Sequence, residues 1–206
     1  MQLLATDDIS DDLVESFRAD LVDIFGKAED DGHMCFRSQD APSWIRLVAD
    51  ADLWVQALTA GGALYIAELI KEAAKETWRS RAKIVAGAVG AGGRVRALAT
   101  KIIRFKSLAP ERVAVVVVLP IPHEYFGAQL QVSSTDPDVL ELELALFVHY
   151  LPAVKALIET NERDGHKAAT GYFLELEGNG ALRISWFAHD TLKKMETVIS
   201  EVGEAI

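Results

Sequence analysis

The middle of the chain, residues 62–106, reads GALYIAELIKEAAKETWRSRAKIVAGAVGAGGRVRALATKIIRFK. Its charge changes partway along, because no acidic residue occurs between Thr77 and Pro110. The eight basic residues of that interval, called the basic stretch below, are Arg79, Arg81, Lys83, Arg94, Arg96, Lys101, Arg104 and Lys106. A glycine-rich segment, residues 87–93, divides the basic stretch in two.

The basic stretch belongs to one of three charge blocks. Residues 1–60 carry 13 acidic and 4 basic side chains, a net charge of −9. Residues 61–112 carry 4 acidic and 11 basic side chains (+7), and residues 113–206 carry 14 and 6 (−8). A positive insert thus lies between two negative ends of a chain whose overall charge is −10. The insert either pairs with its own acidic flanks or faces an anionic partner.

Helical spacing of apolar residues dominates the first 110 residues. The segment Leu13–Phe25 keeps such spacing and ends at Gly26, a natural helix stop. Residues 43–79 are interpreted as a helical hairpin broken at Gly61-Gly62. Residues 94–106 form an amphipathic helix whose apolar positions are Val95, Leu98, Ala99, Ile102 and Phe105.

Strand patterns are weak in the first half of the chain and strong in the second. Gln2–Thr6 predicts an edge strand, and His33–Arg37 predicts a short strand after a turn at residues 29–32. The β-branched run Val113–Leu119 predicts a strand buried on both faces, with Ala128–Ser134 as its hairpin partner.

The remaining segments predict a helix, a second hairpin of two strands and a final helix. A helix begins at Asp136-Pro137, and Pro152 is expected to split it or kink it. Residues 172–177 and 182–187 predict a second hairpin around a Gly-Asn-Gly turn, and residues 189–202 predict a final helix.

These elements together predict an α+β fold in a single compact chain. An N-terminal helical half (residues 1–110) carries the long helical hairpin. A C-terminal half (residues 111–206) forms a four-stranded antiparallel sheet in ββαββα order, with its helices on one face.

No motif identifies a reaction, a metal or a cofactor. The glycine segment lacks the Lys and Ser or Thr of a phosphate-binding loop, since Gly93 and Arg94 occupy those positions. The five histidines are scattered without zinc-site spacing. No base accompanies Cys35, the single cysteine, which suits a reducing setting. We expect no cofactor and a cytoplasmic location, because the chain opens without a secretory signal and no apolar run reaches membrane-spanning length.

The function favoured by these observations is that of a non-catalytic interaction or regulatory protein. Its partner would be another protein, met through the basic stretch or the acidic flanks, as in a bacterial-type signalling or toxin-neutralising partner. One alternative is a peripheral membrane protein that uses residues 94–106 at an anionic surface. Another is an enzyme whose site is assembled from distant residues. The acidic balance of the chain disfavours nucleic acid, as does the basic stretch, whose only interleaved aromatic residue is Phe105, and a homo-oligomer stays open.

Reversing three residues of the basic stretch to Glu separates the two interpretations of its charge. An exposed partner-binding surface would fold with each substitution costing less than about 0.5 kcal/mol, and it would lose salt-dependent binding. Basic residues already paired with the acidic flanks would instead lower the melting temperature without changing binding. Thermal unfolding, measured beside binding to anionic vesicles, nucleic acid and an acidic protein, distinguishes these outcomes.

Overall fold

The computed structural model describes residues 1–34, 43–59, 93–109, 113–121, 124–177 and 180–200. Its strands are β1 (Gln2–Thr6), β2 (Glu29–Met34), β3 (Trp44–Val48), β4 (Ala114–Ile121), β5 (Glu124–Val132), β6 (Ala168–Leu176), β7 (Leu182–Ala188) and β8 (Lys194–Ile199). Its helices are α1 (Asp11–Phe25), α2 (Ala51–Thr59), α5 (Gly93–Leu108) and α6 (Pro137–Arg163).

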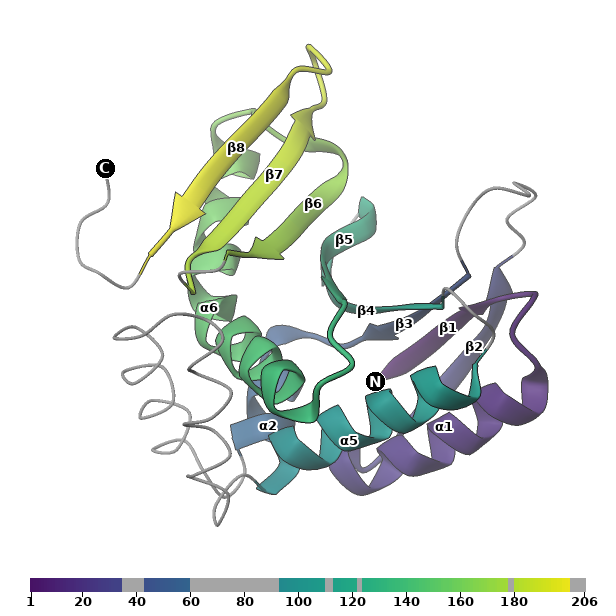
Figure 1. The fold of residues 1–206 in the computed structure, drawn as a ribbon. Helices are drawn as coiled ribbons and strands as arrows, with labels where there is room; N and C mark the ends of the chain where they lie inside the picture. Colours follow the sequence, from purple (N-terminus) through teal and green to yellow (C-terminus); the bar gives the residue numbers. More distant parts are fainter. Residues whose placement is uncertain (35–42, 60–92, 110–112, 122–123, 178–179, 201–206) are drawn as a thin grey trace.

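The described strands form one mixed sheet in the order β2-β1-β3-β4-β5-β6-β7-β8 (Figure 1). Three neighbouring pairs are parallel: β1 with β2, β3 with β4, and β5 with β6. The other neighbours are antiparallel. Parallel neighbours need a long crossover connection, and a helix lies between the two strands of every parallel pair.

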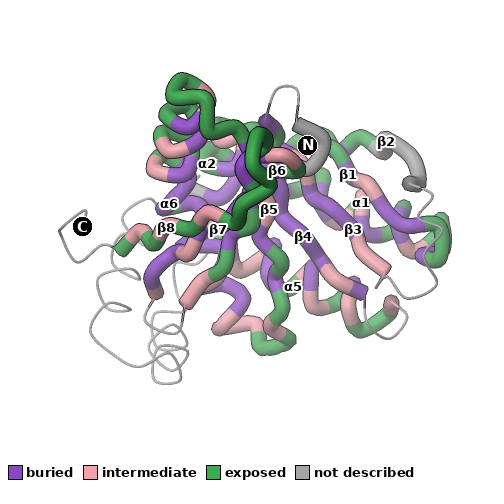
Figure 2. Tube along the Cα trace, turned by 90° about the horizontal axis from the view of Figure 1, so that it is seen from above, coloured by how far each residue is buried: buried purple, intermediate pink, exposed green. Residues whose placement is uncertain are grey.

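The core lies between the helices and one face of this sheet. A row of side chains in register crosses five strands, formed by Leu3, Leu47, Val117, Leu130 and Leu174. None of them is more than 6% exposed. Burying each such side chain stabilises the fold by roughly 1.5–3 kcal/mol. Figure 2 shows buried residues running through the sheet from β1 to β7.

Helices α1 and α5 follow the predicted patterns. Helix α1 ends at Phe25, and the cap residue Gly26 has a positive φ of 73° and donates its N–H to Val22. The predicted apolar positions of residues 94–106 are the buried residues of α5. The Phe105 ring stacks on Phe17 of α1 at 4.5 Å between centroids. Both helix predictions are therefore confirmed.

The local predictions for the second half are largely confirmed. All of the predicted run except Val113 lies in β4, which pairs antiparallel with β5. The Asp136 side chain caps α6 by accepting the Asp138 N–H at 2.9 Å. The second predicted hairpin is β6 and β7.

The predicted fold class is wrong, because the sheet is mixed and includes strands from the first half of the chain. The four-stranded antiparallel sheet is overturned by β5 and β6, which pair in parallel and join the two hairpins. The strand at Gln2–Thr6 is also not an edge strand, since β1 lies between β2 and β3.

The predicted helical hairpin at residues 43–79 is wrong at its start. Trp44–Val48 is strand β3, and the following helix α2 covers only Ala51–Thr59. Residues 60–79 lie outside the described residues. Strand β3 is buried over Ile45, Arg46 and Leu47, and a short run buried on both faces cannot be told from a helix by periodicity.

The predicted final helix at residues 189–202 is also wrong. Lys194–Ile199 is strand β8, antiparallel to β7. Exposed Lys194, Glu196 and Val198 alternate with partly buried residues. Because β8 is an edge strand, even its inward side chains stay partly exposed, and the polar–apolar contrast that marks a strand is weak.

Replacing Gly127 with alanine is expected to destabilise the protein by at least about 2 kcal/mol. This residue has a φ of +62° beside an irregular stretch of the β4–β5 ladder, and an added Cβ would overlap the Leu119 carbonyl oxygen. Gly165→Ala is the matched control, because Gly165 has a φ of +80° but open space around it. Urea unfolding of both variants checks this, and equal losses would contradict the role of the overlap.

Candidate functional site

Five of the eight residues of the basic stretch lie on α5, and each has a contact. The other three, Arg79, Arg81 and Lys83, lie outside the described residues. The first residue, Arg94, is exposed and lies 3.5 Å from the carbonyl oxygen of Ile24.

Arg96 joins α5 to α6. Its guanidinium contacts the carboxylates of Asp138 and Glu141, the latter at 3.0 Å. Glu141 is completely buried, whereas the Arg96 side chain is 32% exposed. A buried carboxylate needs such a partner, because an unpaired charge in the protein interior is strongly unfavourable.

Two further basic side chains of α5 join it to α1. The Lys101 amine lies 3.7 Å from the carboxylates of both Asp20 and Asp23. The Arg104 guanidinium lies 3.5 Å from Asp20. The acidic flanks thus supply partners for this part of the basic stretch, and these contacts favour a fall in melting temperature when it is reversed.

The apolar side of α5 packs inside the protein. Val95, Leu98, Ala99, Ile102 and Phe105 are at most 2% exposed. A basic helix lies in a bilayer interface through its apolar side, and here that side belongs to the core. Among the described helices, none is long and apolar enough to cross a membrane.

Lys106, near the end of α5, lies close to Glu143, a residue that lines a polar cavity. Its amine donates to the carbonyl oxygens of Val132, Ser133 and Ser134 at 3.0–3.4 Å. Burial lowers the pKa of Lys106, and the carboxylate of Glu143 opposes that effect. The amine therefore holds the chain as it leaves β5 and lies near an acidic group of α6.

Glu143 lies at this cavity without a full set of partners. A backbone hydrogen bond from Ser134 and the charge of Lys106 favour its ionised form. Its Oε2 atom is buried and accepts no hydrogen bond within the described part of the chain. Burial dominates and raises the pKa of Glu143 to about 7.

The cavity beside Glu143 has a volume of about 300 Å³. It lies between the carboxyl ends of β5 and β6, and its lining residues are Leu130, Gln131, Ser133, Glu143, Leu174, Glu175 and Leu176. In open α/β sheets, ligands bind in crevices outside the carboxyl ends of strands. We call this cavity the β5–β6 crevice.

A second cavity of about 300 Å³ lies at the carboxyl ends of β3 and β4. Its polar lining comes from Asp50, Asp52, Lys155, Glu159 and Glu162. Asp50 already accepts the N–H of Leu53 at 2.7 Å in the first turn of α2. Among the described residues, no group of three or more His, Cys, Asp or Glu side chains could hold a metal ion.

The sheet face opposite the helices carries exposed aromatic residues on β6 and β7. Tyr172 and Trp186 of these strands are buried, so Phe173, Ser185 and Phe187 point to the other face. Phe173 is 40% exposed and Phe187 is 41% exposed. Ser185 lies directly opposite Phe173, and Phe187 is two residues further along β7.

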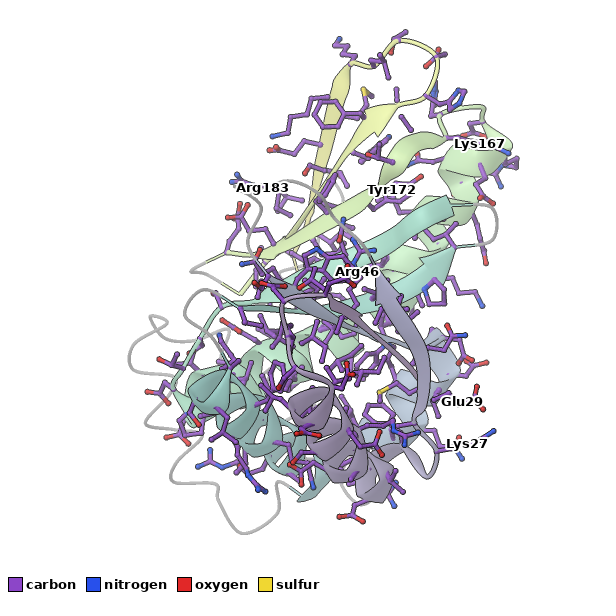
Figure 3. The ribbon with its side chains drawn as sticks, turned by 90° about the vertical axis from the view of Figure 1, so that its right-hand side faces the viewer. Lys27, Glu29, Arg46, Lys167, Tyr172 and Arg183 are labelled. Carbon is purple, nitrogen blue, oxygen red and sulfur yellow. The ribbon has the colours of Figure 1, made fainter. Side chains whose placement is uncertain are left out.

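An ion-pair network borders these aromatic residues. Arg183 of β7, labelled in Figure 3, contacts Glu177 and lies 3.6 Å from Glu196 of β8. Lys194 lies 3.3 Å from the same Glu196. The face therefore has an apolar centre and charged residues that neutralise one another.

Comparison with protein-family models found no match, and neither did comparison with curated proteins or with solved structures. The candidate sites are therefore inferred from the geometry of this chain.

Sequence reasoning named Lys106 but not Glu143. The available signal is the segment Leu140-Glu-Leu-Glu-Leu144, which places two carboxylates in an otherwise apolar stretch of helix. Ionisable residues in such a stretch need a partner, so they mark a contact or a site. Whether such a residue makes a structural contact or forms a site depends on the neighbouring helices and strands, and these come from distant parts of the chain.

The raised pKa of Glu143 predicts a specific pH dependence of stability. The folded protein holds this proton more tightly than the unfolded chain, so the free energy of unfolding falls as pH rises from about 4.5 to about 7. The loss is at most about 3 kcal/mol. Glu143→Gln removes this ionisable group and with it the loss of stability. The stability of this variant relative to the wild type should therefore be greater at pH 8 than at pH 4.5.

Urea unfolding of both proteins at the two pH values measures this difference. Glu159→Gln, on an exposed position of the same helix, controls for the loss of one negative charge. A Glu143→Gln difference that is the same at both pH values contradicts the prediction.

Proposed function

We propose that this is a non-catalytic interaction protein that binds a protein partner on the helix-free face of β6, β7 and β8. The observation that carries the proposal is the pair of exposed phenylalanines on that face. The basic stretch gives less support for a partner surface, because its described residues contact other parts of the chain.

Phe173 and Phe187 supply an apolar anchor of the kind found at protein interfaces. Large aromatic side chains are enriched at the energetic centres of interfaces, where they bury much area at a small entropic cost. Val198 on β8, 49% exposed, extends the apolar surface on the same face. A rim of charged residues around an apolar centre is the usual arrangement of such a contact.

The charges of this face favour a protein over an anionic polymer or surface. Arg183 and Lys194 already have carboxylate partners in Glu177 and Glu196. Glu175 adds a further negative charge beside them. Binding to nucleic acid or to anionic lipid depends on free basic side chains, and this face presents none among its described residues.

The edge of the sheet supports contact through the face and not through strand addition. Strand β8 is the last strand of the described sheet and carries Lys194 and Glu196. Charged residues on an edge strand oppose pairing with another strand.

Photo-crosslinking in cells tests this proposal. A photoreactive benzoylphenylalanine placed at Phe173 or Phe187 should form a discrete adduct with one protein, identified by mass spectrometry. The same group at Val22 of α1 or Val55 of α2 is the matched control, because these residues are 41% and 36% exposed on the helical side. Phe173→Ser with Phe187→Ser should then weaken binding of the purified partner at least about 30-fold, or about 2 kcal/mol.

Thermal unfolding of the double variant verifies that the fold is intact. An adduct with a second copy of the chain would identify the partner as the protein itself. Adducts that form equally from all four positions, or unchanged affinity of the double variant, would refute the proposal.

A further inference from the structure

The β5–β6 crevice exists because two parallel strands separate. Pairing between β5 and β6 ends at Leu130 and Leu174. Strand β5 stays paired with β4 as far as Val132, and β6 stays paired with β7 as far as Leu176. The carboxyl ends of β5 and β6 therefore follow different neighbours, and Figure 1 shows β5 curving away from β6. The cavity of about 300 Å³ lies at this point.

Among the charged groups at the crevice, a carboxylate acceptor is left over and an amine donor is not. The Lys106 amine has three donors, and three backbone carbonyl oxygens accept from it. The Oε2 atom of Glu143 accepts none within the described residues. A second carboxylate, that of Glu175, lines the cavity from β6. An entering group that donates hydrogen bonds and carries positive charge would complete this arrangement.

The remaining lining residues limit the size and shape of a ligand. Leu130, Leu174 and Leu176 give apolar walls, and Gln131 and Ser133 add neutral polar groups. A cavity of this volume lies at the small end of the range for ligand pockets. It suits a compact molecule with one cationic head and a short apolar part.

We propose that the β5–β6 crevice is a binding site for a small organic cation, a primary alkylammonium or alkylguanidinium, held by the carboxylate of Glu143. The cationic head donates to Glu143, and the alkyl part lies against the leucine side chains. An anionic ligand is disfavoured because the three donors of the Lys106 amine are engaged and two carboxyl groups, those of Glu143 and Glu175, line the crevice. This site borders the partner surface at Glu175, but the carboxylate that holds the ligand, Glu143, comes from α6 and is not part of that surface.

Binding requires Glu143 in its ionised form. The charged groups that face it are Lys106 from α5 and Glu175 from β6, and Arg183 of β7 lies near Glu175. Strand β5 contributes Gln131 as a polar side chain to the cavity, and Ser133, the residue that follows the strand, contributes the other. With the pKa of Glu143 raised to about 7, about a tenth of it is ionised at pH 6 and about nine tenths at pH 8. Affinity should therefore rise about tenfold between these pH values.

Titration followed by NMR tests the proposal. The probes are ethyl-, butyl- and hexylammonium and butylguanidinium, with 1-butanol and butyrate as the neutral and anionic controls. At least one cation should shift the methyl signals of Leu130, Leu174 and Leu176 in a saturable way, at least about tenfold more tightly than either control. Its affinity should rise about tenfold from pH 6 to pH 8 and be lost in Glu143→Gln.

A second variant keeps the test independent of the charge at position 143. Leu176→Phe narrows the crevice and should weaken binding while leaving Glu143 in place. Glu159→Gln, at an exposed position of α6 that lines the second cavity and not the β5–β6 crevice, should leave binding unchanged. The proposal is overturned if no cation of the series binds, if butyrate or butanol binds as well, or if Glu143→Gln keeps wild-type affinity.

Discussion

The ion pair between Arg96 of α5 and the fully buried Glu141 of α6 constrains the arrangement of the helices. Burying a carboxylate costs free energy that only a well-placed partner offsets, and removing the partner of such a pair typically costs about 3–5 kcal/mol. The register of α5 against α6 is therefore restricted. Glu143 follows Glu141 by two residues, a rotation of about 200° around the helix. The contact that turns Glu141 towards Arg96 thus turns Glu143 to another side of α6, where Lys106 at the end of α5 and the strands β5 and β6 lie.

The three charge blocks of the sequence become a set of contacts between helices. Asp20 and Asp23 of the first block meet Lys101, and Asp138 and Glu141 of the last block meet Arg96. Helix α5 lies between these acidic side chains, and its apolar side is buried. A positive segment in an acidic protein can therefore help to position helices against one another, because opposite charges on neighbouring helices favour one arrangement over others.

Local features of this fold could be predicted from sequence, and its pairings could not. The stripe of α5, the Gly26 end of α1 and the two hairpins depend on residues close together in the chain. Strand β3 lacks a strand pattern because its three central residues, Ile45–Leu47, are buried on both faces, and β8 lacks one because it is an edge strand. The β5–β6 crevice depends on a parallel pairing and on a helix between the paired strands, so Lys106 alone could not reveal it. No periodicity encodes which strands become neighbours.

The parallel pairing of β3 with β4 has a consequence for how the protein folds. Trp44 lies opposite Ala114, so the two strands that join the halves of the sheet are far apart in the chain. Closing so long a loop costs conformational entropy before any ladder bond forms, and such non-local pairing slows folding. The β6, β7 and β8 strands need only short connections to pair. The two ends of one continuous sheet would therefore form at different times, and pulsed hydrogen exchange during refolding would show early protection in β7 and late protection in β3.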